Sequence, residues 1–175
     1  MAGFFKKLFG AANGEGKRRA PDVRAIDQGL PDARGMPTSL EQGMEWQAAD
    51  FVAAFSGPGS PIDEGKLDYS EASLALVDDV LDDFHRQGEP LPSELHFLAS
   101  AYVFEVARRE FGGRYLRFDE ENPFVLEIAD GQTRVGVCVM GKVRGRVVNG
   151  PEDSIPFFYA GIAPLVAAGA SATLI

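Results

Sequence analysis

The chain has few of the residues that support covalent cross-links or a structural metal centre. Cys138 is its single cysteine, and there are two histidines. No disulfide can form within the chain, and no cysteine-rich metal site exists. This usage is typical of proteins in a reducing cytoplasm. We therefore expect a cytoplasmic protein that uses no metal ion or other cofactor.

Long apolar runs are also missing. No stretch approaches the roughly 20 apolar residues needed to span a bilayer. Near the N-terminus, Lys6 and Lys7 interrupt the apolar residues, which argues against a secretory signal. The C-terminal segment IAPLVAAGASATLI is apolar but short, and it contains Pro164 and Gly169. We expect this segment to pack on the core as an arm.

Basic residues are too few for a nucleic-acid-binding protein. The chain has 17 Lys and Arg against 26 Asp and Glu, a net charge of −9, whereas phosphate binding needs a basic surface. Residues 1–35 hold seven basic and four acidic side chains, while residues 36–175 hold ten and twenty-two. The sequence thus predicts a basic tail on an acidic body, and a protein partner that is itself basic.

The rest of the composition is that of an ordinary globular domain. The 175 residues, 45% of them hydrophobic, are enough to bury one core. Residues 11–37 are rich in Gly, Pro, Arg and Asp, which is typical of a flexible linker. We expect residues 1–36 to form a flexible basic tail with a short amphipathic segment. Residues 37–175 should form a single acidic α+β domain.

Three helices are expected in the first part of this domain. In PTSLEQGMEWQAADFVAAF, Thr38 and Glu41 form a capping-box pattern ahead of apolar residues at helical spacing. A second helix starts near Ser70 with a C-cap at Gly88. A third has its N-cap at Ser93 and ends before a Gly-Gly pair. The expected buried stripes are Leu40, Met44, Ala48, Phe51 and Phe55; Leu74, Val77, Leu81 and Phe84; and Leu95, Leu98, Tyr102 and Val106.

Short segments rich in β-branched and aromatic residues follow: RYLRF, PFVLEIAD and TRVGVCVM. With the Asp-Gly hairpin signal at 130–131, they predict a three-stranded antiparallel sheet. GKVRGRVVNG fits a strand or a helix, and its final Asn-Gly pair favours a short helix. One or two C-terminal helices are expected, one of them starting at Pro151. Its buried stripe would be Ile155, Phe158 and Ile162.

GVCVMGKV has the spacing of a phosphate-binding P-loop. That loop needs small, flexible residues between its glycines and then Ser or Thr to hold magnesium. Here strand-forming residues lie between Gly136 and Gly141, and Val143 follows Lys142. The pattern therefore does not predict nucleotide binding.

Cys138 with His85 or His96 is the combination that could supply a nucleophile and a base. Cys138, however, stands between valines in an expected strand, where a buried and inert thiol is usual. Each histidine lies on an expected helix, with no partner that the sequence locates. We assign no catalytic residue.

The run DDVLDD places Asp78 one helical turn before Asp82, and Asp79 before Asp83. A calcium or magnesium site needs more oxygen ligands than this spacing supplies. We expect a solvated acidic helix face and no metal ligands, with a docking surface for a basic partner as the alternative.

Glu105 lies close to an expected buried stripe, where an unpaired carboxylate would be costly. Arg109, at i+4, is its expected partner, and a functional pocket shared with Tyr102 is the alternative. Lys142, Arg144 and Arg146 form a basic set that either binds an acidic partner or balances the acidic body. The candidate binding residues are Tyr102, Glu105, Arg109, Lys142, Arg144 and Arg146.

The N-terminal MAGFFKKLFG has an apolar helical face and two lysines that point away from it. This is the composition of a short membrane-surface anchor, and the basic residues at 17–19 would attract anionic lipid. Docking on the chain's own domain or in a partner's groove would use the same residues, and a disordered end is also common. The candidate docking residues are Phe4, Phe5, Lys6, Lys7, Leu8 and Phe9.

The segment YVFEVARREFGGRYLRF, followed by paired strands and GKVRGRVVNGPEDSIPFFYAGI, resembles small uncharacterised bacterial domains over about residues 67–162. In these domains a helix with a Tyr–Glu pattern leads through a Gly-Gly turn to a short sheet and a final helix pair. The resemblance implies an α+β fold without an established activity, and some similar domains look like immunity or accessory proteins. It places Tyr102 and Glu105 in the helix motif and transfers no catalytic role.

The sequence as a whole favours a non-enzymatic protein-binding domain of a bacterial cytoplasmic protein, immunity-like or accessory. The first alternative is a peripheral membrane adaptor at the inner face of the membrane, anchored by residues 4–9. The second is an enzyme with a pocket around Glu105.

Overall fold

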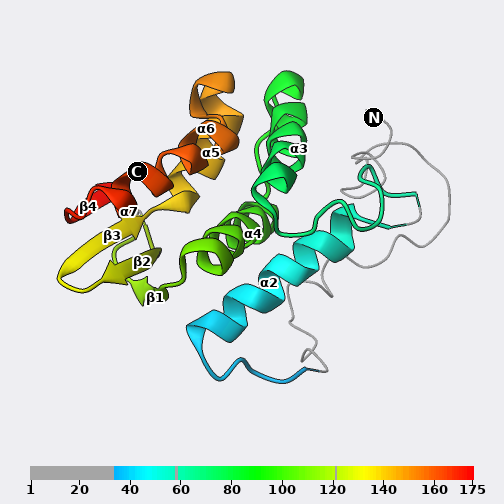
Figure 1. Ribbon diagram of the computed structural model, residues 1–175. Coiled ribbons are helices and arrows are strands. Elements are labelled where there is room, and N and C mark those ends of the chain that lie inside the picture. Colours follow the sequence, from blue (N-terminus) through cyan, green and yellow to red (C-terminus); the bar gives the residue numbers. More distant parts are fainter. Residues whose placement is uncertain (1–33, 58, 121) are drawn as a thin grey trace, which may run out of the picture. The chain divides into compact units, whose positions relative to one another are not determined.

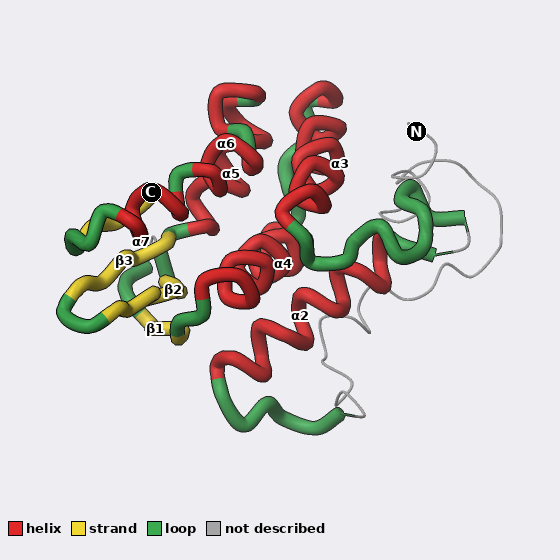
Figure 2. The backbone as a smooth tube through the Cα atoms, viewed as in Figure 1, coloured by secondary structure: helices red, strands yellow, loops and turns green. Residues whose placement is uncertain are grey.

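The computed structural model describes residues 34–57, 59–120 and 122–175. The candidate docking segment at residues 4–9 therefore lies outside the described residues. Ser39–Ile175 form one compact unit, which contains helices and a four-stranded sheet (Figures 1 and 2). Within the described part of the chain, no helix combines the length and the apolarity needed to cross a membrane.

The class is α+β, as expected. The elements in chain order are α2 (Leu40–Phe55), η2 (Glu71–Ser73), α3 (Leu74–Gln87), α4 (Ser93–Phe111), β1 (Arg114–Arg117), β2 (Phe124–Asp130), β3 (Thr133–Val137), α5 (Val139–Asn149), η3 (Pro151–Asp153), α6 (Ile155–Ala160), α7 (Ile162–Ala167) and β4 (Ala172–Leu174). The two η elements are single 3₁₀ turns.

Helix α4 is the centre of the core. Every side chain from Ala101 to Ala107 is buried, because α2, α5 and the sheet pack around the helix (Figure 1). Aromatic rings fill the contact with α2: Phe51 lies 5.4 Å from Tyr102, centroid to centroid, and stacks on Phe55 at 4.8 Å. A helix enclosed in this way buries polar positions together with apolar ones, Glu105 among them.

The sheet has the order β1-β2-β3-β4. Its first three strands are antiparallel, as expected. The fourth comes from the C-terminal arm and pairs in parallel with β3, with Val135 opposite Ala172 and Val137 opposite Leu174. The expectation of a three-stranded sheet missed this strand, because three residues are too few to show alternation.

Two expected helix starts are shifted by one residue. Ser39, and not Thr38, is the N-cap of α2, and its Oγ accepts a hydrogen bond from the backbone N–H of Gln42 at 3.1 Å. The Glu41 carboxylate instead accepts from the backbone N–H of Tyr115 at 3.3 Å, which ties α2 to β1. The N-cap of α4 is Pro92, so Ser93 is the first helical residue. Gly88 ends α3 in the left-handed conformation, as expected.

The buried stripes are confirmed except at Leu40 and Leu98, which are partly exposed.

TRVGVCVM was expected to be one strand, but β3 ends at Val137 and Cys138 is the N-cap of α5. An unbroken apolar run does not distinguish a buried strand from a buried helix start, which is why the boundary was missed. GKVRGRVVNG is helical, as favoured. The helix expected from Pro151 is divided into η3 and α6 at Ser154.

Candidate functional site

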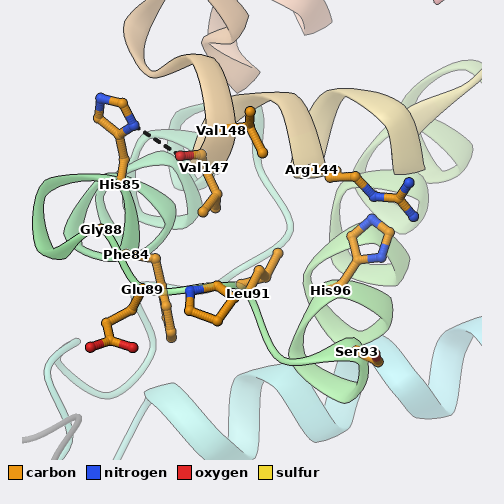
Figure 3. A pocket seen from close by; sticks show the side chains of 11 residues that line it. Phe84, His85, Gly88, Glu89, Leu91, Ser93, His96, Arg144, Val147 and Val148 are labelled. Atoms are coloured by element: carbon orange, nitrogen blue, oxygen red, sulfur yellow. Dashed lines mark hydrogen bonds between the residues drawn. The ribbon is translucent and has the colours of Figure 1, made fainter.

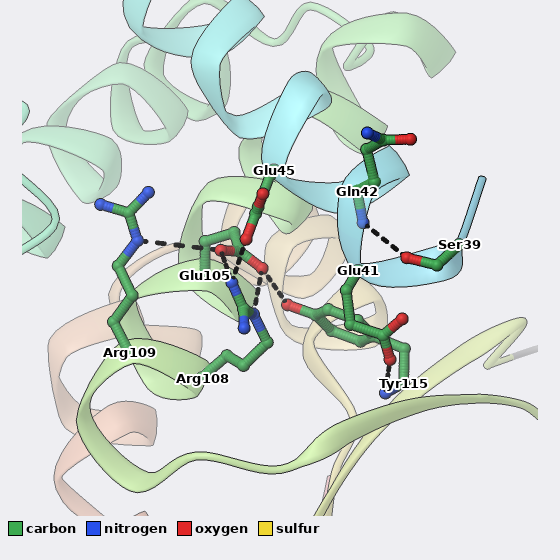
Figure 4. Close-up of polar contacts among 8 residues, drawn as sticks. All are labelled: Ser39, Glu41, Gln42, Glu45, Glu105, Arg108, Arg109 and Tyr115. Carbon is green, nitrogen blue, oxygen red and sulfur yellow. Dashed lines mark hydrogen bonds and ion pairs between the residues drawn. The ribbon is translucent and has the colours of Figure 1, made fainter. Parts of the chain in front are cut away.

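The Glu105 carboxylate is fully buried on α4 and is neutralised by its neighbours (Figure 4). The Nε and Nη2 atoms of Arg108 donate to its two oxygens at 2.8 and 2.9 Å, and the hydroxyl of Tyr115 donates at 2.7 Å. Arg109, the expected partner, also forms an ion pair with the carboxylate, with its Nε at the longer distance of 3.8 Å (Figure 4). The principal partner is therefore the arginine at i+3, which forms a bidentate pair that also contacts Glu45 of α2.

Tyr115 and Arg108 keep their protons in this cluster. Burial, and then the negative charge of Glu105, raise the pKa of the Tyr115 hydroxyl well above its usual range, so it stays a donor. The hydrogen bonds to Glu105 raise the pKa of Arg108. Glu105 does not line the cavities that contain Phe84, Phe157 and Cys138. The cluster therefore joins α2, α4 and β1 around the fully buried carboxylate of Glu105.

Tyr102 and Arg109 hold the segment before α3 against α4. The buried Tyr102 hydroxyl lies 2.8 Å from Oγ of Ser73 and accepts a hydrogen bond from the backbone N–H of Tyr69 at 2.9 Å. The Tyr69 ring stacks on Tyr102, and the guanidinium of Arg109 lies 3.5 Å from the centroid of the Tyr69 ring. Tyr69 has φ of 64°, a conformation that is costly for a bulky residue. These contacts compensate for that strain.

The structure separates the three members of the expected basic set. Lys142 pairs with Asp153 at 2.8 Å. Arg146 is buried, with 4% of its surface exposed. Arg144 is exposed, and it forms no ion pair with any residue that the structure describes. The set therefore does not form a common surface, although the three residues lie within five positions of α5.

Arg146 binds the acidic run of α3. Its Nε donates to Asp78 at 3.0 Å and its Nη2 donates to Asp82 at 2.7 Å. The other oxygen of Asp78 accepts from the backbone N–H of Ile155 at 2.8 Å, and Asp82 also pairs with Arg86. The expectation of a solvated acidic face is wrong for Asp78 and Asp82. The spacing showed that they share a face, but not that α5 places an arginine across that face.

Lowering the pH should reduce the stability that the Asp82–Arg146 contact contributes. The hydrogen bond from Arg146 holds the pKa of Asp82 below its ordinary value of 3.8. Such a group stabilises the fold fully above the unfolded-state value, and the contribution is lost as the pH falls through the lowered folded-state value. Urea unfolding should show Asp82→Asn less stable than the parent at about pH 6, with the difference shrinking toward about pH 3. Asp79→Asn controls for the lost charge, and a difference independent of pH would contradict the assignment.

The largest of the described cavities, about 590 Å³, lies between the end of α3, the loop to α4, the start of α4, and α5 (Figure 3). It is lined by Phe84, His85, Gly88, Glu89, Pro90, Leu91, Ser93, His96, Arg144, Val147 and Val148. Both histidines of the chain are in this set. The sequence carried no signal for this site, because the lining residues lie on three elements that only the tertiary structure brings together.

Each histidine is held by a backbone carbonyl of α5. Nδ1 of His85 lies 2.9 Å from the carbonyl oxygen of Val147, and Nε2 of His96 lies 2.8 Å from that of Met140. A carbonyl oxygen can only accept, so these two nitrogens carry the protons. In the neutral rings, Nε2 of His85 and Nδ1 of His96 are therefore the basic nitrogens.

A second cavity of about 350 Å³, the Phe157 groove, lies beside α6 and β4. Its lining residues are Lys142, Glu152, Asp153, Ser154, Phe157, Phe158, Ala160, Gly161, Leu174 and Ile175. The side chains of Phe157 and Ile175 are 80% and 71% exposed. Two large apolar side chains thus face solvent in one concave surface. The predicted buried stripe of this helix, Ile155, Phe158 and Ile162, leaves Phe157 off the buried face, but the sequence did not indicate that it lines a groove.

A third cavity is lined by residues of the four strands and by Cys138, the N-cap of α5. Cys138 is itself buried, and burial raises the pKa of its thiol, which disfavours the thiolate. In the described ranges, no group of three or more His, Cys, Asp or Glu side chains is placed to hold a metal ion.

No family model, no curated protein and no solved structure matches the chain. The resemblance over residues 67–162 therefore stays a prediction.

Proposed function

We propose that the domain is a non-enzymatic protein-binding module, of an accessory or immunity-like kind, in a bacterial cytoplasm. The observation that carries this proposal is the exposure of Phe157 in a groove with Ile175. Aromatic side chains that stand exposed in a pocket are frequent energetic centres of protein interfaces. Burying the Phe157 side chain alone would contribute about 1.5–3 kcal/mol to binding.

The charge of the domain favours a basic partner. Residues 36–175 carry ten basic and twenty-two acidic side chains, a net of −12. At the rim of the groove, Lys142 is already neutralised by Asp153, which leaves the exposed Glu152 as the uncompensated charge. A partner that presents an apolar side chain flanked by Lys or Arg matches this surface. Its association would be accelerated by the acidic body and slowed by salt.

A photo-crosslinking amino acid at position 157 tests the proposal in the native host. We expect it to capture one basic protein, because the side chain lies in the groove, and we expect Phe157→Ala to weaken that protein's binding by about tenfold or more. The same amino acid at Glu94, an exposed position on α4 that lines none of the three cavities, is the matched control. Equal capture from both positions, or unchanged binding by Phe157→Ala, would remove the groove from the interface.

The same experiment separates the tail from the domain. The peripheral membrane adaptor remains the second candidate, because residues 4–9 combine four apolar side chains with two lysines. If that proposal holds, a chain that lacks residues 1–20 loses its partner or its membrane association, whereas Phe157→Ala keeps it. If the groove is the interface, the shortened chain still captures the partner from position 157.

A further inference from the structure

We propose that the cavity between α3, α4 and α5 binds a small ligand that carries one carboxylate on an apolar body, with Arg144 as its charge partner. The cavity volume of about 590 Å³ falls within the roughly 300–1,000 Å³ that is usual for small-molecule sites. This site is separate from the Phe157 groove, since the two share no lining residue.

The polar end of the cavity is formed by Arg144 and His96. Figure 3 shows the Arg144 guanidinium beside the His96 ring. Arg144 has no ion pair with any residue in the described ranges, unlike Lys142 and Arg146 on the same helix. A guanidinium without a carboxylate partner matches the two oxygens of a carboxylate.

His96 offers a second contact at this end. Because its Nε2–H is committed to the carbonyl of Met140, its Nδ1 is the nitrogen left for a ligand. A neutral imidazole accepts a hydrogen bond at Nδ1, and an imidazolium donates one there.

The remaining walls suit an apolar body. Phe84, Leu91, Val147 and Val148 line the cavity between its two ends. The one acidic residue of the lining, Glu89, lies at the opposite end in Figure 3, and its carboxylate points away from Arg144. A ligand with a single negative charge fits better than a phosphate, since the domain's net charge of −12 opposes multiply charged anions.

The two histidines make the test direct. They are the only histidines of the chain and both line the cavity, so the imidazole signals in NMR spectra of the full chain report on this site alone. Titration with benzoate should shift these signals in a saturable way, whereas benzyl alcohol, a neutral molecule of similar shape, should bind about tenfold more weakly. The imidazole signals that disappear in the His85→Gln variant belong to His85, and those that remain belong to His96.

Arg144→Gln decides the role of the guanidinium. Its side chain is exposed and unpaired within the described residues, so the variant should fold like the parent while its Kd for benzoate rises about tenfold. Arg117→Gln, an exposed arginine on β1 outside the cavity, is the control and should bind as the parent does. Three results would each overturn the proposal: no saturable shift with benzoate, equal binding of benzyl alcohol, or unchanged binding by Arg144→Gln.

Discussion

Replacing Glu105 with alanine should lower the free energy of unfolding by about 3 kcal/mol or more. The carboxylate is fully buried and accepts three hydrogen bonds, two from Arg108 and one from Tyr115. Without it, the buried Tyr115 hydroxyl loses its acceptor, which alone costs about 1–3 kcal/mol. Arg108 keeps its pair with Glu45, which limits the damage on that side. Urea or guanidinium unfolding at neutral pH measures the difference.

Two further variants identify the cause of this loss. Glu105→Gln keeps the size of the side chain and an acceptor for Tyr115, but it turns an amide N–H₂ toward the donors of Arg108, so it should recover only part of the stability. Glu94→Gln, an exposed position in the first turn of the same helix, should cost less than about 1 kcal/mol. If Glu105→Ala lowers the free energy of unfolding by less than about 1 kcal/mol, the cluster does not stabilise the contact between α2, α4 and β1. That result would favour a functional role for Glu105.

The surroundings of Glu105 could be predicted from the sequence only in part. Helical spacing placed it beside a buried stripe, and the cost of a buried charge required a cation, so both its burial and its ion pair were predictable. The choice of Arg108 over Arg109 was not, because it depends on the direction in which α2 and β1 approach the helix. The Tyr115 hydroxyl comes from a strand whose existence was predicted but whose register against α4 was not.

Features that depend on local chemistry were predicted well. The C-cap at Gly88, the hairpin between β2 and β3, and most buried stripes follow from one segment at a time. The strand β4, the cavity with both histidines and the buried state of Arg146 depend on how distant segments meet. Sequence periodicity does not predict contacts between distant segments. The spacing of Arg146 is therefore that of a surface residue, although the structure buries it.

Arg146→Ala should destabilise the domain by about 3–5 kcal/mol, because it leaves two carboxylates under α5 without their cation. Asp82 keeps Arg86 and Asp78 keeps the backbone N–H of Ile155, so we expect the lower part of this range. Arg146→Lys should recover little, since a single ammonium cannot reproduce the separate Nε and Nη2 contacts to Asp78 and Asp82. Arg144→Ala, two residues away and exposed, is the matched control and should change stability by less than about 0.5 kcal/mol.

A double-mutant cycle separates the pair from the cost of breaking it. Asp82→Asn and Arg146→Ala should each destabilise, and the combined variant should lose less than their sum, because the second change removes a group that the first left unpaired. A strictly additive result would show that Arg146 acts through its apolar stem instead of its charge.

Nη1 of Arg146 is buried without a hydrogen-bond partner among the described residues, and such an atom costs about 1–3 kcal/mol. The pair of α3 and α5 therefore contributes less to stability than its breaking costs.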